Sequence, residues 1–324
     1  MTALPAEPFP GRPRIIFMGT PDFAVPTLKA LITHGHDVLA VVTQPDRPKG
    51  RGKKLTAPPV KQLALEHGIE VLQPEKASDE VFCGRIREKN PDLIVVVAFG
   101  QILKKRLLDI PKWGVINVHG SLLPNLRGAA PIQWTLLNDE TKTGLTVMHM
   151  DEGMDTGPIL FQEEVPVLKD ETAGHLYDRL AAMAGDLISR SLERMSGSIV
   201  EAIPQDHTRA TYAPKISKDL CLVNWKEEAA KVSARIRGMD PRPGAYTLWE
   251  GKEIKLFAST VIDSDREGVS PGQVLGLKEE GCLVVGTGRG TVGVRELQYP
   301  GKNRLPAREF LRGFSLPVGA VLGQ

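Results

Sequence analysis

Long runs of Val, Ile and Leu, separated by stretches with helical spacing, restrict the fold of this 324-residue chain more than any other feature. Such runs lie at residues 14–19, 37–44, 92–98, 113–119 and 143–150. Apolar strands of this kind are typical of a parallel sheet that helices cover on both faces. The sequence therefore predicts a Rossmann-like α/β domain with a mostly parallel sheet.

The pattern of apolar and polar residues changes near residue 200. Leucines at near-helical spacing predict a long helix over residues 170–195, which closes the first domain. The segment that follows is polar, contains two prolines and indicates a linker. Short strand-like runs with Gly-rich turns then predict a small β-barrel. We expect a first domain over 13–200, a linker over 201–218 and a second domain over 219–324.

The composition is that of a globular protein, with 41% hydrophobic and 25% charged residues. The cysteines, Cys83, Cys221 and Cys282, are far apart and form no C-x-x-C pair, so neither a metal site nor a disulfide framework is expected. The most apolar run, residues 93–103, is too short to cross a bilayer. The proline-rich N-terminus lacks the apolar segment of a signal peptide. We expect a cytoplasmic protein.

The charge is distributed unevenly along the chain. Residues from His207 onward carry 18 Lys and Arg against 13 Asp and Glu, a net charge of +5, whereas the whole chain has a net charge of +2. A basic second half can attract an anionic partner such as nucleic acid. An excess of this size also occurs on ordinary soluble domains, so the charge alone does not decide the partner.

A cluster of five cations falls within eight residues of a Gly- and Pro-rich segment: Arg47, Lys49, Arg51, Lys53 and Lys54. The segment has no apolar face to bury, so we expect a mobile, solvated loop. Flexible cations can bind phosphates without a fixed geometry, because they release counterions. A solvated surface without a binding role is the alternative interpretation of these residues.

The stretch GTPDFAVPTLKAL follows the first predicted strand and lacks the three-glycine spacing of dinucleotide-binding domains. A nicotinamide-dependent dehydrogenase is therefore disfavoured. The turn at Gly19 can hold an anionic group at a helix N-terminus. It can also be simply a tight turn between a strand and a helix.

The stretch NVHGSLLPNLRGAAPIQW, residues 117–134, carries the most specific pattern. Its strand would deliver Asn117 and His119 to the carboxyl end of the sheet, where α/β proteins have their ligand crevices. Two residues apart on an extended chain, the two side chains point to the same face. An amide donor and a titratable donor together can stabilise an oxygen that gains negative charge.

A loop rich in acidic residues, MDEGMDTGPI, follows another predicted strand. It contains Asp151, Glu152 and Asp155. A carboxylate near His119 would favour its protonated form and fix its ring. A metal site or a turn with solvated charges is also compatible with these residues, and their spacing does not select one of the three carboxylates.

Together these motifs resemble the formyltransferases that use 10-formyltetrahydrofolate, whose signature matches NVHGSLLPNLRGAAPI followed by MDEGMDTG. The stretches GTPDFAVPTL, TQPDRPKGRGKKL, LIVVVAFGQIL and IRGMDPRPGAYT narrow the resemblance to the methionyl-tRNA formyltransferase family. The resemblance extends from about residue 13 to beyond residue 310. The family pattern does not account for His149.

The resemblance implies roles for the motif residues. It implies a catalytic trio of Asn117, His119 and Asp155. It implies that the folate is contacted by Ser121, Leu122, Leu123 and Pro124. It further implies that the basic loop reaches the acceptor stem of a tRNA, and that the second domain is OB-like and lies against the tRNA.

The implied reaction transfers the formyl group of 10-formyltetrahydrofolate to the α-amino group of methionine on initiator Met-tRNA, for translation initiation. The folate is a co-substrate, and no metal or membrane is called for. We expect a monomer. Two alternatives stay open: a formyltransferase for a small amine such as glycinamide ribonucleotide or an amino sugar, and an RNA-binding protein without chemistry. The basic loop disfavours a small-amine substrate, and the presence of all three residues of the trio disfavours a protein without chemistry.

Overall fold

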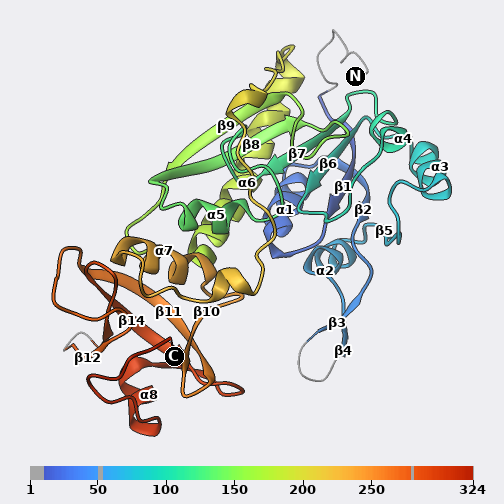
Figure 1. The fold of residues 1–324 in the computed structure, drawn as a ribbon. Coiled ribbons are helices and arrows are strands. Elements are labelled where there is room, and N and C mark those ends of the chain that lie inside the picture. The colour runs from blue at the N-terminus through green and yellow to red at the C-terminus, as the bar shows by residue number, and fades with distance from the viewer. Residues whose placement is uncertain (1–10, 50–53, 279–280, 324) are drawn as a thin grey trace. The chain divides into compact units, whose positions relative to one another are not determined.

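A computed structural model describes residues 11–49, 54–278 and 281–323 (Figure 1). It contains a mixed, mostly parallel sheet with helices, followed along the chain by an antiparallel β structure. The predicted α/β fold class is therefore confirmed. Within the described ranges, no helix is long and apolar enough to cross a membrane.

The chain divides into two compact units. The first contains the residues up to 128 together with 144–165 and 177–212. The second contains the remaining residues, including the whole chain from 213 onward. The segment interpreted as a linker thus contributes residues 201–212 to the first unit. The domain limits inferred from the sequence stay a prediction.

The sheet of the first unit has seven strands in the described part of the chain, in the order β5-β2-β1-β6-β7-β8-β9. Neighbours from β5 to β7 run parallel, and β8 runs antiparallel to β7. All residues of β6 and β7 are buried, as expected for central strands. The strands are β1 (Arg14–Gly19), β2 (Asp37–Val42), β5 (Val71–Leu72), β6 (Leu93–Val97), β7 (Val115–His119), β8 (Lys142–His149) and β9 (Ile159–Pro166).

Helices cover both faces of this sheet. Apolar side chains of α3 (Glu80–Lys89) and α4 (Lys105–Leu108) pack in one core with Ile16 and Met18 of β1. Alternate residues of a strand face opposite sides, so Ile15 and Phe17 face the other layer. There α1 (Val25–Thr33) lies against α6 (Ala173–Gly197), and α2 (Pro59–Glu66) packs on α1 and β2.

A short hairpin projects from the first unit between β2 and α2 (Figure 1). Its strands, β3 (Arg47–Lys49) and β4 (Lys54–Thr56), are antiparallel, with Arg47 opposite Thr56 and Lys49 opposite Lys54. The sequence predicted a loop throughout, but the two flanks pair through their backbones. Arg51 and Lys53 lie outside the described residues.

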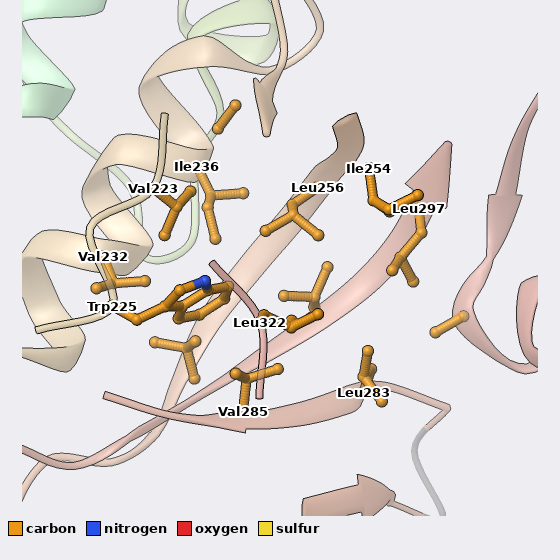
Figure 2. Close-up of a cluster of buried hydrophobic side chains, with 14 of the residues drawn as sticks. Val223, Trp225, Val232, Ile236, Ile254, Leu256, Leu283, Val285, Leu297 and Leu322 are labelled. Atoms are coloured by element: carbon orange, nitrogen blue, oxygen red, sulfur yellow. The ribbon is translucent and has the colours of Figure 1, made fainter. Parts of the chain in front are cut away.

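The second unit is built on an antiparallel sheet with the order β10-β11-β14-β13-β12, and β15 pairs with β14. Helix α7 packs on the sheet, and α5 lies against α7. Figure 2 shows Trp225 within the core, where its indole N–H also donates to Thr247 Oγ1 at 2.9 Å. The elements are β10 (Ala245–Trp249), β11 (Lys252–Asp263), β12 (Val274–Leu277), β13 (Leu283–Gly286), β14 (Thr291–Gln298), β15 (Arg304–Pro306), α5 (Pro131–Leu137), α7 (Ala229–Met239) and α8 (Ala307–Gly313).

Candidate active site

The carboxyl end of β7 carries the first two residues of the site. Asn117 and His119 are buried, with exposed fractions of 9% and 6%. They are separated by one residue on a regular strand, so their side chains lie on the same face of the sheet. The sequence-based expectation about their location is therefore met.

The ring of His119 is held through Nε2. This nitrogen lies 3.0 Å from the carbonyl oxygen of Leu126. A carbonyl oxygen only accepts, so Nε2 carries the proton of this hydrogen bond. The other nitrogen, Nδ1, faces Asp155.

Asp155 is the carboxylate that the fold brings to His119. Its Oδ2 lies 3.7 Å from His119 Nδ1, which is too long for a hydrogen bond but close enough for charge attraction. The same oxygen accepts the backbone N–H of Gly128 at 2.8 Å. Asp155 has a left-handed backbone with φ of +53°, a conformation that Asp tolerates better than most residues.

The other two acidic candidates have different surroundings. Asp151 accepts from Thr156 Oγ1 at 2.6 Å and from the Gly153 N–H at 3.0 Å, so its carboxylate organises the loop itself. Glu152 is exposed. The geometry near His119 thus distinguishes Asp155 from both, which sequence spacing could not do.

The amide of Asn117 is available for a ligand. Among the described residues it makes no hydrogen bond with another protein group. A buried amide with an open donor, next to an imidazole and a carboxylate, can bind an oxygen atom that becomes negatively charged.

The segment Ser121 to Pro124 follows β7 directly and is tightly supported. Ser121 and Leu123 are buried, whereas Leu122 and Pro124 are half-buried and reach the surface. Ser121 Oγ donates to the carbonyl of Asn125 at 2.6 Å. A folate contact by this segment stays a prediction, and the side chains exposed for it belong to Leu122 and Pro124.

Two residues outside the sequence motifs, Thr146 and Gln162, hold this segment in position. Thr146 Oγ1 donates to the Ser121 carbonyl at 2.7 Å and accepts the Leu123 N–H at 3.1 Å. Gln162 Nε2 donates to the Leu123 carbonyl at 2.8 Å and to Thr146 Oγ1 at 3.0 Å. Thr146 lies opposite His119 in the β7–β8 pair, and this antiparallel pairing is not visible in the sequence.

The root of the basic hairpin is anchored by a polar network. Asp46, directly before β3, binds the ammonium of Lys61 at 2.9 Å and the amide of Gln73 at 2.8 Å. Hydrogen bonds from Gln73 and Lys61 lower the pKa of the Asp46 carboxyl. Gln73 Nε2 also donates to the carbonyl of Gln44 at 2.8 Å. The hairpin therefore starts from a fixed point on the first unit.

His149 is buried in β8, opposite Ile116. Burial lowers its pKa to about 4, against an opposing effect of its hydrogen bond to the Val115 backbone. It is therefore a neutral group inside the sheet near pH 7, and its location does not join it to the trio. Within the residues that the structure describes, no cluster of three or more His, Cys, Asp or Glu could hold a metal ion.

Two family models match the chain. The model described as "Formyl transferase" matches residues 13–192, and "Formyl transferase, C-terminal domain" matches residues 215–315. Together the matches cover more than half of the chain.

Full-length relatives are similar in sequence. A methionyl-tRNA formyltransferase of Geobacter metallireducens is 50% identical over 309 residues, which are 95% of this chain and 98% of the relative. Those of Geobacter sulfurreducens and Acetivibrio thermocellus are 50% and 45% identical over 311 residues, 96% of this chain and 97% and 100% of the relatives.

Solved structures are similar in fold. WlaRD, a sugar 3N-formyl transferase crystallised in the presence of dTDP and 5-N-formyl-THF, has a TM-score of 0.64 at 18% identity, with 90% of this chain and 98% of WlaRD covered. HypX from Aquifex aeolicus, in complex with tetrahydrofolic acid, has a TM-score of 0.63 at 19% identity. The match covers 93% of this chain but only 47% of HypX.

Proposed function

Because the chain belongs to the methionyl-tRNA formyltransferase family, we propose that it transfers the formyl group of 10-formyltetrahydrofolate to the α-amino group of methionine on initiator Met-tRNA. The observation that carries this proposal within the site is the approach of Asp155 to His119, on the strand that also bears Asn117. An amide, an imidazole and a carboxylate are the groups that such an acyl transfer needs.

The nucleophile in this scheme is the amine itself. An α-amino group has a reference pKa near 8, so a useful fraction is neutral near pH 7. The amine nitrogen attacks the formyl carbon, a C–N bond forms, and the formyl oxygen becomes negatively charged. No activated Ser or Cys is required.

Asn117 and His119 stabilise this oxygen. The open amide donor of Asn117 supplies one hydrogen bond. His119 Nε2 is engaged by Leu126, so the Nδ1–H of the protonated ring is the second donor. The Asp155 carboxylate lies 3.7 Å from Nδ1, so it faces the ring by charge attraction rather than through a hydrogen bond that would occupy Nδ1.

Two proton transfers complete the reaction. Asp155 accepts the proton of the attacking amine, directly or through a water molecule, with the carboxylate oxygen that does not bind Gly128. The C–N bond to the folate then breaks, its electron pair returns to the folate nitrogen, and His119 or a water molecule protonates that nitrogen. Formylmethionyl-tRNA and tetrahydrofolate leave the site.

The remaining predicted contacts serve the two substrates. We assign the segment Ser121 to Pro124 to the folate, because it follows the catalytic strand directly. We assign the basic hairpin to the acceptor stem, because clustered cations bind phosphates and Asp46 anchors its root. We keep the prediction of a monomer in the cytoplasm, and sedimentation equilibrium of the purified chain tests the oligomeric state.

The first experiment incubates the purified protein with 10-formyltetrahydrofolate and methionine-charged initiator tRNA, then identifies the released amino acid. Charged elongator tRNA and free methionine are run in parallel. We expect formylmethionine from the initiator sample alone. Formylation of a small amine without product on initiator tRNA would contradict the proposed substrate.

Two variants test substrate recognition and catalysis independently. Deletion of residues 47–54 should abolish formylation of the tRNA while leaving the catalytic trio intact. Asn117→Ala should lower the turnover number roughly 10²- to 10³-fold, the usual cost of one oxyanion donor. An Asn117→Ala enzyme with near-normal turnover would remove Asn117 from the mechanism.

A further inference from the structure

A buried guanidinium lies beside the site. Arg127 is only 2% exposed. Its Nε and Nη2 donate to Gln205 Oε1 at 3.1 and 2.6 Å, and Nη2 lies 3.1 Å from His207 Nδ1, which must accept. Neither partner is a carboxylate, and among the described residues Arg127 takes part in no ion pair. A buried charge without a carboxylate partner is costly, so its neighbours merit a functional explanation.

Arg127 fixes the orientation of the Gln205 amide. A guanidinium only donates, so the amide oxygen must face Arg127. The NH₂ group then points the other way, where it donates to the carbonyl of Asp155 at 2.9 Å and to that of Gly157 at 2.7 Å. If the amide were flipped, its NH₂ group would face Arg127 and its oxygen would face the two carbonyls, so the hydrogen bonds at both ends would be lost.

Asp155 is consequently held from two directions. Gly128, the neighbour of Arg127, binds the carboxylate through its N–H at 2.8 Å, and Gln205 binds the backbone of the same residue. The φ of +53° at Asp155 is a conformation that the surroundings must enforce. The bonds from Gln205 to residues 155 and 157 span the turn that directs the carboxylate to His119.

We propose that Gln205 is a positioning residue for Asp155, and that Arg127 serves to orient the Gln205 amide. The proposal rests on the function proposed above. In this role Gln205 acts on the distance between Asp155 and His119 rather than on either substrate. The predicted signature is a loss of turnover without a loss of substrate binding.

The competing explanation is that Gln205 only solvates the Arg127 charge. Gln205→Glu separates the two explanations. The glutamate has the same size and pairs with Arg127 through an ion pair, so the charge is better compensated than before. It has no N–H for the carbonyls of Asp155 and Gly157, and its oxygens repel them.

We expect Gln205→Glu to remain folded, with a cooperative thermal transition, and to retain the KM for both substrates, while kcat falls about 10- to 100-fold, as for a misplaced reacting group. Asn90→Asp is the matched control, because it makes the same chemical change on an exposed residue at the end of α3. It should keep the wild-type kcat. A Gln205→Glu enzyme with wild-type kcat would overturn the proposal.

A double-mutant cycle tests the role of Arg127. If Arg127 acts through Gln205, then Arg127→Met, Gln205→Ala and the double variant should lower kcat by similar factors. Additive losses would show that Arg127 acts independently and overturn that part of the proposal. The wild-type assay on initiator tRNA is read first, since its failure would contradict the proposed function, whereas failure of the variants alone concerns Gln205 and Arg127.

Discussion

His119 Nδ1 lies 3.7 Å from Asp155 Oδ2, while the Gly128 N–H binds that same oxygen at 2.8 Å. The carboxylate is therefore fixed by the loop after β7 and approaches the imidazole without bonding to it. This leaves Nδ1–H free for a reacting oxygen, and it makes the charge of Asp155 more important than its hydrogen-bonding capacity.

Removing this charge should remove most of the activity. Asp155→Asn keeps an oxygen for the Gly128 N–H but loses the negative charge and the proton acceptor. We expect kcat to fall roughly 10²- to 10⁴-fold, the range of a lost general base, with KM for the tRNA little changed. Steady-state kinetics on charged initiator tRNA measures both. The exposed neighbour Glu152 provides the control, since Glu152→Gln should retain wild-type kcat.

Acid should destabilise the protein through His149. Its pKa is about 4 in the fold and near 6.5 when unfolded, so the unfolded chain binds more protons between these values. The stabilisation is complete above pH 6.5 and is lost as the pH falls towards 4. From pH 7 to pH 5 this residue alone should reduce the free energy of unfolding by about 2 kcal/mol.

Denaturant unfolding at the two pH values, compared between wild type and His149→Gln, measures this contribution. The variant should lose less stability on acidification than the wild type. His67→Gln, on an exposed histidine, should keep the wild-type pH dependence. Equal pH dependence of wild type and His149→Gln would show that His149 is not buried in its neutral form.

Gly157 should not tolerate a side chain. A Cβ at this position would lie 1.8 Å from the carbonyl oxygen of His149, so the two backbone segments would have to separate. We expect Gly157→Ala to lower the free energy of unfolding by at least about 2 kcal/mol, as overpacking does. Gly84→Ala is the control, and it should change stability in the opposite direction. Gly84 lies in α3, and nothing lies within 4 Å of the new Cβ. The free energy of unfolding should therefore rise by about 1 kcal/mol, because Ala favours a helix more than Gly does. Thermal unfolding of both variants compares them directly.

The cations of the hairpin should make the affinity for tRNA depend on the salt concentration. Lys49 and Lys54 lie opposite one another on β3 and β4. Replacing both by Ser should weaken tRNA binding and reduce the slope of log affinity against log salt by about 1 to 2. Binding titrations at several salt concentrations give this slope. Lys29→Ser, an exposed substitution on α1, should leave it unchanged; a slope unaltered in the double variant would count against contacts between these lysines and phosphates.

Local residue patterns predict the layers of the first unit and part of its site. Continuous apolar runs such as Leu93–Val97 are typical of buried strands, and their composition is a local property of the chain. The same holds for Asn117 and His119, because the alternation of an extended strand orients both side chains without any tertiary contact. The loop predicted at Arg47 was partly wrong, since strand pairing depends on a partner segment.

The identity of the carboxylate that approaches His119, and the contacts that hold it there, depend on tertiary packing. Sequence spacing does not distinguish Asp151, Glu152 and Asp155. Asp155 is the one that approaches His119, because hydrogen bonds from Gly128 and Gln205 hold it in a left-handed turn. Gln205 lies 50 residues beyond Asp155 in a polar segment without periodicity. Hydrogen bonds between residues so far apart depend on the packing of the whole sheet, which no local pattern of residues encodes.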